Sequence, residues 1–139
     1  MTRFLITLRE GVDFVLSSLD VMHGGEIFVP KIPSMKVTDM AAAMAPGLAT
    51  KVIGIRPGEK LHEMMISTDD ARTTVDLGDR YAIEPSFVEY LRVPFRLPGG
   101  AGGVPEDFAY ASDSNTEWLT NGQLMAMVDG TYGLEPAVA

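Results

Sequence analysis

The chain has 139 residues, of which 46% are hydrophobic and 22% charged, a composition that predicts one globular domain with a core of its own. It contains no cysteine, which excludes a disulfide scaffold, a thiolate zinc site and a cysteine nucleophile. A net charge of -8 has the wrong sign for binding nucleic acid or an anionic membrane, and no apolar run approaches the roughly 20 residues of a membrane span.

The charge is distributed unevenly along the chain. Residues 1–60 carry seven basic and six acidic side chains (net +1), whereas residues 61–139 carry four basic and thirteen acidic ones (net -9). The first part is therefore the one that can face a small anion.

The first predicted element is a helix that begins after Thr7. Thr7 and Glu10 have the spacing of a capping box, in which each side chain bonds the other residue's backbone N–H. Apolar residues then recur at three- and four-residue steps until Gly24 and Gly25, which end the helix. They are Leu8, Val12, Val15, Leu16, Leu19 and Met22. This single stripe predicts a helix that faces the core.

Two strands and a short helix are predicted next. A β-prone run that stops at Pro30 predicts a buried strand, and the prolines after it predict an extended connection. Thr38 and Asp39 can cap a short helix. The expected bounds are 26–29 for the first strand, 31–34 for the connection, 40–44 for the helix and 51–55 for the second strand.

The second half of the chain has weaker patterns. The turn at 56–59 is expected to lead into a helix, and Gly78-Asp79 is typical of a tight hairpin turn between two short strands. The expected bounds are 60–65 for the helix, 73–77 and 80–83 for the strands, 94–105 for a flexible glycine- and proline-rich loop, and 120–128 for a last helix.

The alternation of helices with short strands predicts a small mixed α/β domain rather than a bundle or a sandwich. We expect a single domain over residues 1–139, with its core over 1–93, a flexible loop over 94–107 and a C-terminal segment over 108–139.

No complete catalytic or metal-binding set is visible in the sequence. The glycines at 99–103 lack the Gly-Lys-Ser/Thr ending of a phosphate loop, so a plain flexible loop is expected there. His62-Glu63 begins like a zinc-protease motif, but the residue four positions after His62 is Ile66, and an ordinary surface histidine is expected. The sequence also has no Tyr-x-x-x-Lys pair and no Gly-x-Ser-x-Gly elbow.

The turn at Arg56-Pro57-Gly58-Glu59 is the best candidate for a binding site. A guanidinium at the end of a strand can grip a phosphate with two hydrogen bonds, and a helix beginning here would point free N–H groups at the same anion. The Glu59 carboxylate can accept two hydrogen bonds from a sugar diol. Arg56 and Glu59 could together hold a nucleotide, but a structural ion pair between Arg56 and an acidic neighbour explains the same residues.

Around this turn the sequence resembles a known family. Residues 55–63, together with 1–4, 24–31 and 33–36, are similar to the carboxy-terminal part of C5-inverting UDP-N-acetylglucosamine 4,6-dehydratases. These are extended short-chain dehydrogenases of the polysaccharide biosynthesis group. The resemblance runs from Met1 to about Pro85 and returns at residues 108–119.

The resemblance implies roles for three residues. Arg3 and Arg56 are expected to contact the UDP diphosphate, and Glu59 the ribose. Arg3 is implied by the resemblance alone. The implied fold is the substrate-binding portion of an extended short-chain dehydrogenase, without its Rossmann domain. In the whole enzyme, NADP oxidises C4 of the sugar, water is lost across C5 and C6, and hydride returns to C6 with inversion at C5.

We therefore expect a UDP-sugar-binding domain that is incomplete without an NADP-binding domain, with no catalytic, metal or cofactor residues of its own. The expected partners are a UDP-sugar and a separate or missing Rossmann domain, without nucleic acid or membrane, in the cytoplasm. Homo-oligomerisation stays open. The alternatives are a non-catalytic nucleotide-sugar binding or assembly module, and an inactive truncated fragment.

Overall fold

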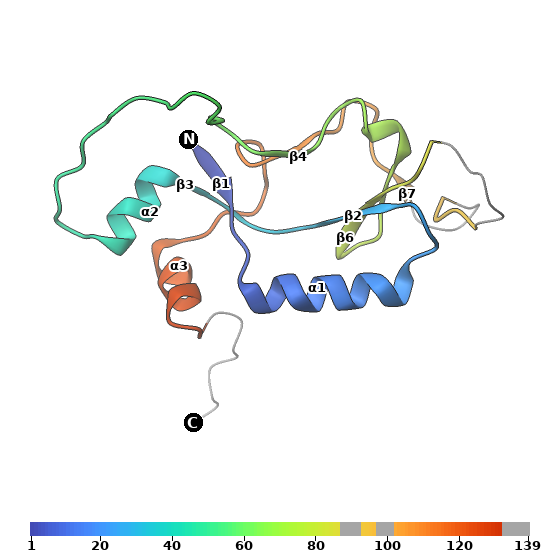
Figure 1. The fold of residues 1–139 in the computed structure, drawn as a ribbon, viewed down its shortest axis with the longest axis horizontal. Helices are drawn as coiled ribbons and strands as arrows, with labels where there is room; N and C mark the ends of the chain where they lie inside the picture. Colours follow the sequence, from blue (N-terminus) through green and yellow to red (C-terminus); the bar gives the residue numbers. More distant parts are fainter. Residues whose placement is uncertain (87–92, 97–101, 132–139) are drawn as a thin grey trace.

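A computed structural model describes residues 1–86, 93–96 and 102–131 (Figure 1). Within these ranges the helices are α1 (Leu8–Val21), α2 (Val37–Met44) and α3 (Asn121–Val128), and a 3-10 turn spans Ala71–Thr73. The strands are β1 (Thr2–Phe4), β2 (Ile27–Pro30), β3 (Ser34–Lys36), β4 (Met64–Ile66), β5 (Thr74–Asp76), β6 (Arg80–Ile83), β7 (Gly102–Gly103) and β8 (Tyr110–Ala111). The predicted small mixed α/β fold is confirmed.

The strands form small antiparallel sheets from segments far apart in the sequence. The larger sheet has the order β2-β6-β5-β7, while β1 pairs with β3 and β4 pairs with β8. The predicted hairpin is confirmed: β5 and β6 pair, the Leu77 N–H donates to the Arg80 carbonyl over 2.9 Å, and Gly78 has a φ of +95°. Glycine fits this turn because a positive φ strains other residues.

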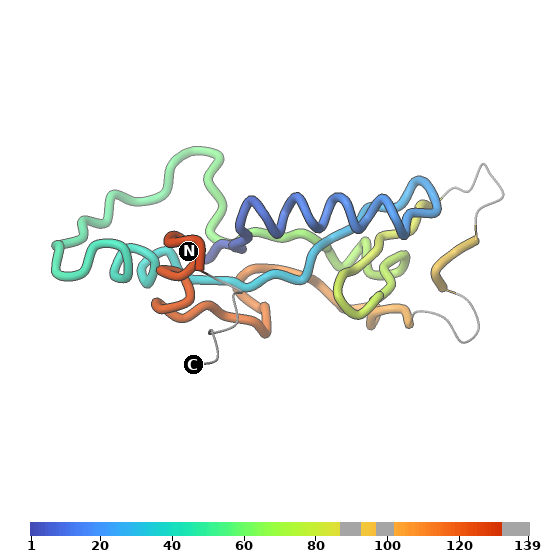
Figure 2. The backbone as a smooth tube through the Cα atoms, turned by 90° about the horizontal axis from the view of Figure 1, so that it is seen from below, coloured from blue at the N-terminus to red at the C-terminus, as the bar shows by residue number. Residues whose placement is uncertain are grey.

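The start of α1 is confirmed and its predicted burial is wrong. Thr7 and Glu10 form both hydrogen bonds of the capping box. The apolar stripe from Leu8 to Met22, however, is between 49% and 86% exposed, and α1 runs along the edge of the molecule in both views (Figures 1 and 2). Periodicity shows which face of a helix is apolar, but not whether this chain supplies a surface to cover it.

The elements predicted for residues 51–55 and 60–65 are wrong. The first range contains no strand, and Val52 and Ile53 are 94% and 70% exposed. Gly54 and Gly58 take positive φ values of 83° and 80°, which interrupt both strand and helix. In place of the second helix, the chain extends into β4, because its register with β8 places Ile66 opposite Tyr110 and in the core.

The remaining predictions differ mainly at element bounds. The predicted connection at 31–34 runs into β3, whose partner β1 was not predicted. α2 begins at Val37, so Thr38 and Asp39 lie inside its first turn rather than capping it. The last helix is confirmed, with a capping box between Thr120 and Gln123.

The predicted loop at 94–105 is only partly described. Residues 97–101 lie outside the described residues, and Gly102 and Gly103 form β7 against β5.

The core consists of two apolar clusters. The first joins the sheets around Val29, Ile66 and Tyr110. The second holds α2 and α3 against β3 around Met35, Leu119 and Leu124. No helix of the described ranges combines the length and apolar character needed to cross a membrane.

Candidate functional site

The predicted site lies on an exposed segment that we call the arch, residues 47–62. The arch leaves α2, stands away from the rest of the molecule and returns at β4 (Figures 1 and 2). Every one of its residues is exposed. Its side chains are therefore available to a ligand.

Arg56 and Glu59 meet in one turn of the arch. The Glu59 N–H donates to the Arg56 carbonyl over 3.0 Å, and the Arg56 N–H donates to the Glu59 carboxylate over 3.1 Å. The predicted helix N-terminus is wrong, because no helix follows Arg56 before β4. Within the described part of the chain, no acidic group lies within 4.0 Å of the Arg56 guanidinium, so the ion-pair alternative is not formed there.

Arg3, the third predicted residue, lies at the end of the arch. Its Nη1 donates to the Thr2 carbonyl over 2.7 Å and to the Leu61 carbonyl over 3.3 Å, and its Nη2 donates to the Lys60 carbonyl over 2.9 Å. Its Nε lies 3.4 Å from the Glu63 carboxylate. The structure thus brings Arg3 to the residues that directly follow Glu59. The side chain keeps 26% of its surface exposed.

Thr2, the residue before Arg3, belongs to a network of hydroxyl groups that the sequence did not predict. Thr2 Oγ1 is 2.6 Å from Ser112 Oγ and 2.9 Å from His62 Nδ1. The Glu63 N–H donates to Ser112 Oγ over 2.9 Å, and Asp113 Oδ2 lies 4.0 Å from His62 Nδ1. The only signal for this network was the return of the family resemblance at residues 108–119, which carries no information on contacts.

A small cavity is lined by both polar and aromatic side chains. Its volume is about 100 Å³, and Lys31, Tyr81, Tyr110, Asn115 and Glu117 contribute to its lining. Lys31 pairs with Asp76 over 2.7 Å and lies 4.5 Å from the centre of the Tyr81 ring. Burial raises the pKa of both tyrosines, and nearby acidic side chains add to the effect. Both tyrosine hydroxyls therefore stay protonated at ordinary pH.

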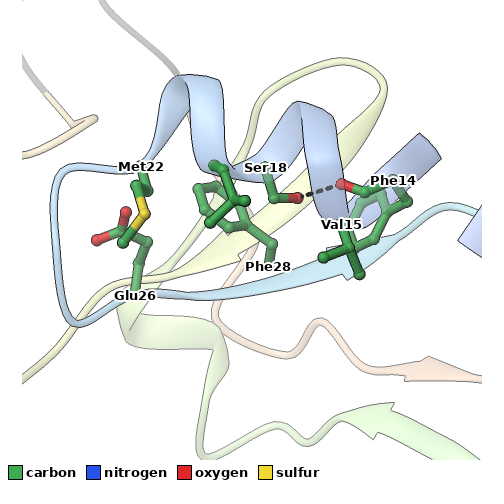
Figure 3. A pocket seen from close by; sticks show the side chains of 7 residues that line it. Phe14, Val15, Ser18, Met22, Glu26 and Phe28 are labelled. Carbon is green, nitrogen blue, oxygen red and sulfur yellow. Dashed lines mark hydrogen bonds between the residues drawn. The ribbon is translucent and has the colours of Figure 1, made fainter. Parts of the chain in front are cut away.

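An apolar hollow of about 270 Å³ lies between α1 and β2 (Figure 3). Figure 3 shows Phe14 and Val15 on α1, Phe28 on β2, and Met22 beside Glu26 where the chain leaves the helix. The Ser18 hydroxyl donates to the Phe14 carbonyl over 2.7 Å. The hollow has little polar lining besides Ser18 and Glu26. It carries no group that would grip a phosphate. In the described ranges, no cluster of three or more His, Asp or Glu side chains could hold a metal ion.

Comparison with known proteins gives close relatives. The chain is 49% identical over 138 residues to UDP-N-acetylglucosamine 4,6-dehydratase (inverting) of Campylobacter jejuni serotype O:2, and 48% identical over 137 residues to the enzyme of the same name from serotype O:23/36. Each match covers 96% of this chain and 41% of the relative. The chain thus spans well under half the length of these relatives.

Two further proteins match more distantly. A UDP-glucose 4-epimerase of Rickettsia bellii is 38% identical over 87 residues, which cover 60% of this chain and 26% of the epimerase. A solved structure described as the X-ray structure of Pen from Bacillus thuringiensis has a TM-score of 0.69 over 94% of this chain and 38% of its own, with 21% identity. This likeness shows a shared fold.

The polysaccharide biosynthesis protein family model matches residues 1–85, a stretch that holds β1, the arch and Arg3, Arg56 and Glu59. This chain therefore belongs to the polysaccharide biosynthesis protein family.

Proposed function

We propose that this chain binds the UDP part of a nucleotide sugar for a 4,6-dehydratase that acts on UDP-N-acetylglucosamine or a close relative. The observation that carries the proposal is the 49% identity to a dehydratase of that name over nearly the whole chain, arch included. The proposed ligands are Arg3, Arg56 and Glu59.

The chemistry of the arch supports a phosphate ester as the ligand. A diphosphate is best held by guanidinium groups, whose planar forks match its oxygens, at a site where those groups are not already neutralised. Arg56 meets this condition on the exposed arch. Arg3 is already paired with Glu63 and keeps 26% of its side chain exposed, so its support for the proposal is its position beside Lys60.

Glu59 supports the ribose assignment. Its carboxylate accepts the Arg56 N–H, which fixes the turn while leaving lone pairs that can accept hydrogen bonds from a diol. In this arrangement one turn presents a cation for the phosphates and an acceptor for the sugar of the same nucleotide.

The redox part of the proposed reaction belongs elsewhere in the enzyme. Oxidation at C4 needs a nicotinamide cofactor, and the residues of this chain do not fit one: Gly102 and Gly103 pair with β5 instead of opening a helix, and the sequence lacks Tyr-x-x-x-Lys. We infer that a separate NADP-binding domain supplies the cofactor, while this chain binds and orients the nucleotide.

Calorimetric titration with UDP, with uridine as the phosphate-free comparison, tests the proposal. We expect saturable binding of UDP that weakens at least about tenfold in Arg56→Ala, because the diphosphate loses a main counter-charge. Lys51→Ala removes another exposed cation of the arch and should bind UDP like the wild type. Equal affinity in the wild type and Arg56→Ala, or equal weakening in Lys51→Ala, would contradict the site.

A further inference from the structure

One end of the arch is held by Arg3 and by two further residues, Thr2 and Ser112, that the proposed ligand set does not include. In the described structure, residues 47–59 form hydrogen bonds with one another, such as the pair between Arg56 and Glu59, and with Ala45 at the end of α2. Residues 60–63, in contrast, are held by β1 and by Ser112, the residue after β8. We call residues 60–63 the clamped segment.

Ser112, the residue after β8, bonds both backbone groups of Glu63. Its N–H donates to the Glu63 carbonyl over 2.8 Å, and its Oγ accepts the Glu63 N–H over 2.9 Å. Both backbone groups of one residue are thus satisfied by one serine. Ser112 is fully buried, so water cannot replace these bonds.

Thr2 extends the same network to the two residues before Glu63. Its N–H donates to the Leu61 carbonyl over 3.0 Å, and its Oγ1 bonds both Ser112 Oγ, at 2.6 Å, and His62 Nδ1, at 2.9 Å. Arg3 then holds the Lys60 and Leu61 carbonyls. Every residue of the clamped segment therefore has a partner on β1 or beside β8.

We propose that Ser112 is a positioning residue for the nucleotide site, acting through Thr2 and Glu63 to fix the end of the arch next to Arg56 and Glu59. The inference rests on the proposed function for its ligand. Glu59 directly precedes the clamped segment, so the freedom of the turn is set by how tightly Lys60 to Glu63 are held. Ordering this segment before the nucleotide arrives removes a conformational cost from binding.

Four variants distinguish the loss of the hydroxyl network from a general loss of folding. Ser112→Ala removes Oγ but keeps the backbone bond to Glu63, and Ser114→Ala is its matched control two residues away, where an exposed hydroxyl meets only the Ala111 carbonyl. Thr2→Val removes the second hydroxyl at nearly constant shape, and Thr2→Ser keeps it. If Ser112→Ala does not fold, the Thr2 pair carries the test.

Trypsin provides a readout that needs no ligand. The Lys60-Leu61 bond lies in the clamped segment, where Arg3 holds both carbonyls, whereas the Lys51-Val52 bond lies in the unclamped part of the arch. We expect the wild type to be cut after Lys51 well before Lys60. Ser112→Ala and Thr2→Val should raise cleavage after Lys60 several-fold at unchanged cleavage after Lys51, because local opening sets the rate. An unchanged ratio of the two rates would overturn the clamp.

Measuring the affinity for UDP tests whether the clamped segment influences the nucleotide site. We expect Ser112→Ala and Thr2→Val to weaken UDP binding about tenfold, and Ser114→Ala and Thr2→Ser to leave it unchanged. In an Arg56→Lys background the Ser112→Ala effect should shrink, since neighbours acting on one site are not additive. Full additivity, or wild-type affinity in Ser112→Ala, would overturn the positioning role. Absence of UDP binding in the wild type, with the cleavage ratio as expected, would overturn the proposed function and keep the clamp.

Discussion

The Tyr110 hydroxyl illustrates how single polar atoms hold this small core together. It accepts the Ile32 N–H over 2.8 Å and donates to the Ile32 carbonyl over 2.9 Å, while its ring packs against Phe4 and Tyr81. Tyr110 is buried, so the Ile32 N–H has no access to replacement water.

We therefore expect Tyr110→Phe to lower the free energy of unfolding by about 1–3 kcal/mol, the cost of leaving a buried donor unpaired. Tyr81→Phe is the matched control, because the Tyr81 ring belongs to the same aromatic cluster but its hydroxyl bonds no atom of the described chain. Urea denaturation of both variants measures the difference. Equal losses would mean that the Ile32 bonds contribute nothing.

For single residues, the sequence predicted contacts between neighbours but not contacts between residues far apart in the chain. Arg56 and Glu59 lie three positions apart, and their turn was predictable from Pro57 and Gly58. Thr2 and Ser112 are separated by 110 positions, and no local pattern reports that their hydroxyls meet. The role of Arg3 at Lys60 and Leu61 depends on the same long-range pairing.

Two carboxylates of the β5–β6 hairpin, Asp76 and Asp79, have lowered pKa values that make the stability of the fold depend on pH. The hydrogen bonds from Arg80 are the main reason that the pKa of Asp79 lies below its ordinary value. Burial acts to raise the pKa of Asp76, but the hydrogen bonds from Lys31 and the Gly78 N–H, with the Lys31 charge, outweigh it and leave this pKa lowered too.

A lowered pKa in the folded state predicts the sign of the pH dependence. The stabilisation is fully present above the ordinary carboxyl pKa of about 4 and is lost as the pH falls through the folded value. Asp76→Asn should therefore be less stable than the wild type at pH 6, by less than about 1 kcal/mol because the pair is partly exposed, and the difference should vanish toward pH 2. Thermal unfolding across this range checks it, with the exposed Asp69→Asn as control. A difference that grows in acid would contradict the assignment.

The capping box of α1 was predicted from the sequence because a cap is a contact between neighbouring residues. The box of α3 has the same spacing and was not predicted, although the helix itself was. The arch was mispredicted as strand and helix because its apolar residues suggest burial that only a distant surface could provide. The same reason explains the exposed stripe of α1.

The exposure of α1 gives a stability prediction. Leu16 is 57% exposed and Met35 is 1% exposed. We expect Leu16→Ala to cost below about 1 kcal/mol, since little apolar area leaves a buried site, and Met35→Ala to cost about 2–5 kcal/mol through loss of burial and a cavity. Chemical denaturation of the two variants measures both values. A Leu16→Ala cost equal to that of Met35→Ala would show that the stripe is covered in solution.

Across the chain, pairings of distant strands build the fold, and two of them, β1–β3 and β4–β8, bring the elements of the site together. The β1–β3, β4–β8 and β2–β6 pairs join segments that the sequence predicted singly or not at all. The fold class followed from the alternation of helix and strand, but the topology did not, because pairing depends on contacts between residues far apart. The matches to the Campylobacter relatives cover 41% of the length of each relative.

The most direct test of the nucleotide site is a ¹⁵N-labelled spectrum of the chain, recorded during titration with UDP. We expect shifts in the amide signals of the Arg56–Glu59 turn and of residues 60–63, with saturation at one UDP per chain, while the signals of α1 and α3 stay unchanged. Signals that shift around the hollow between α1 and β2, or uniformly over the surface, would contradict a nucleotide site on the arch.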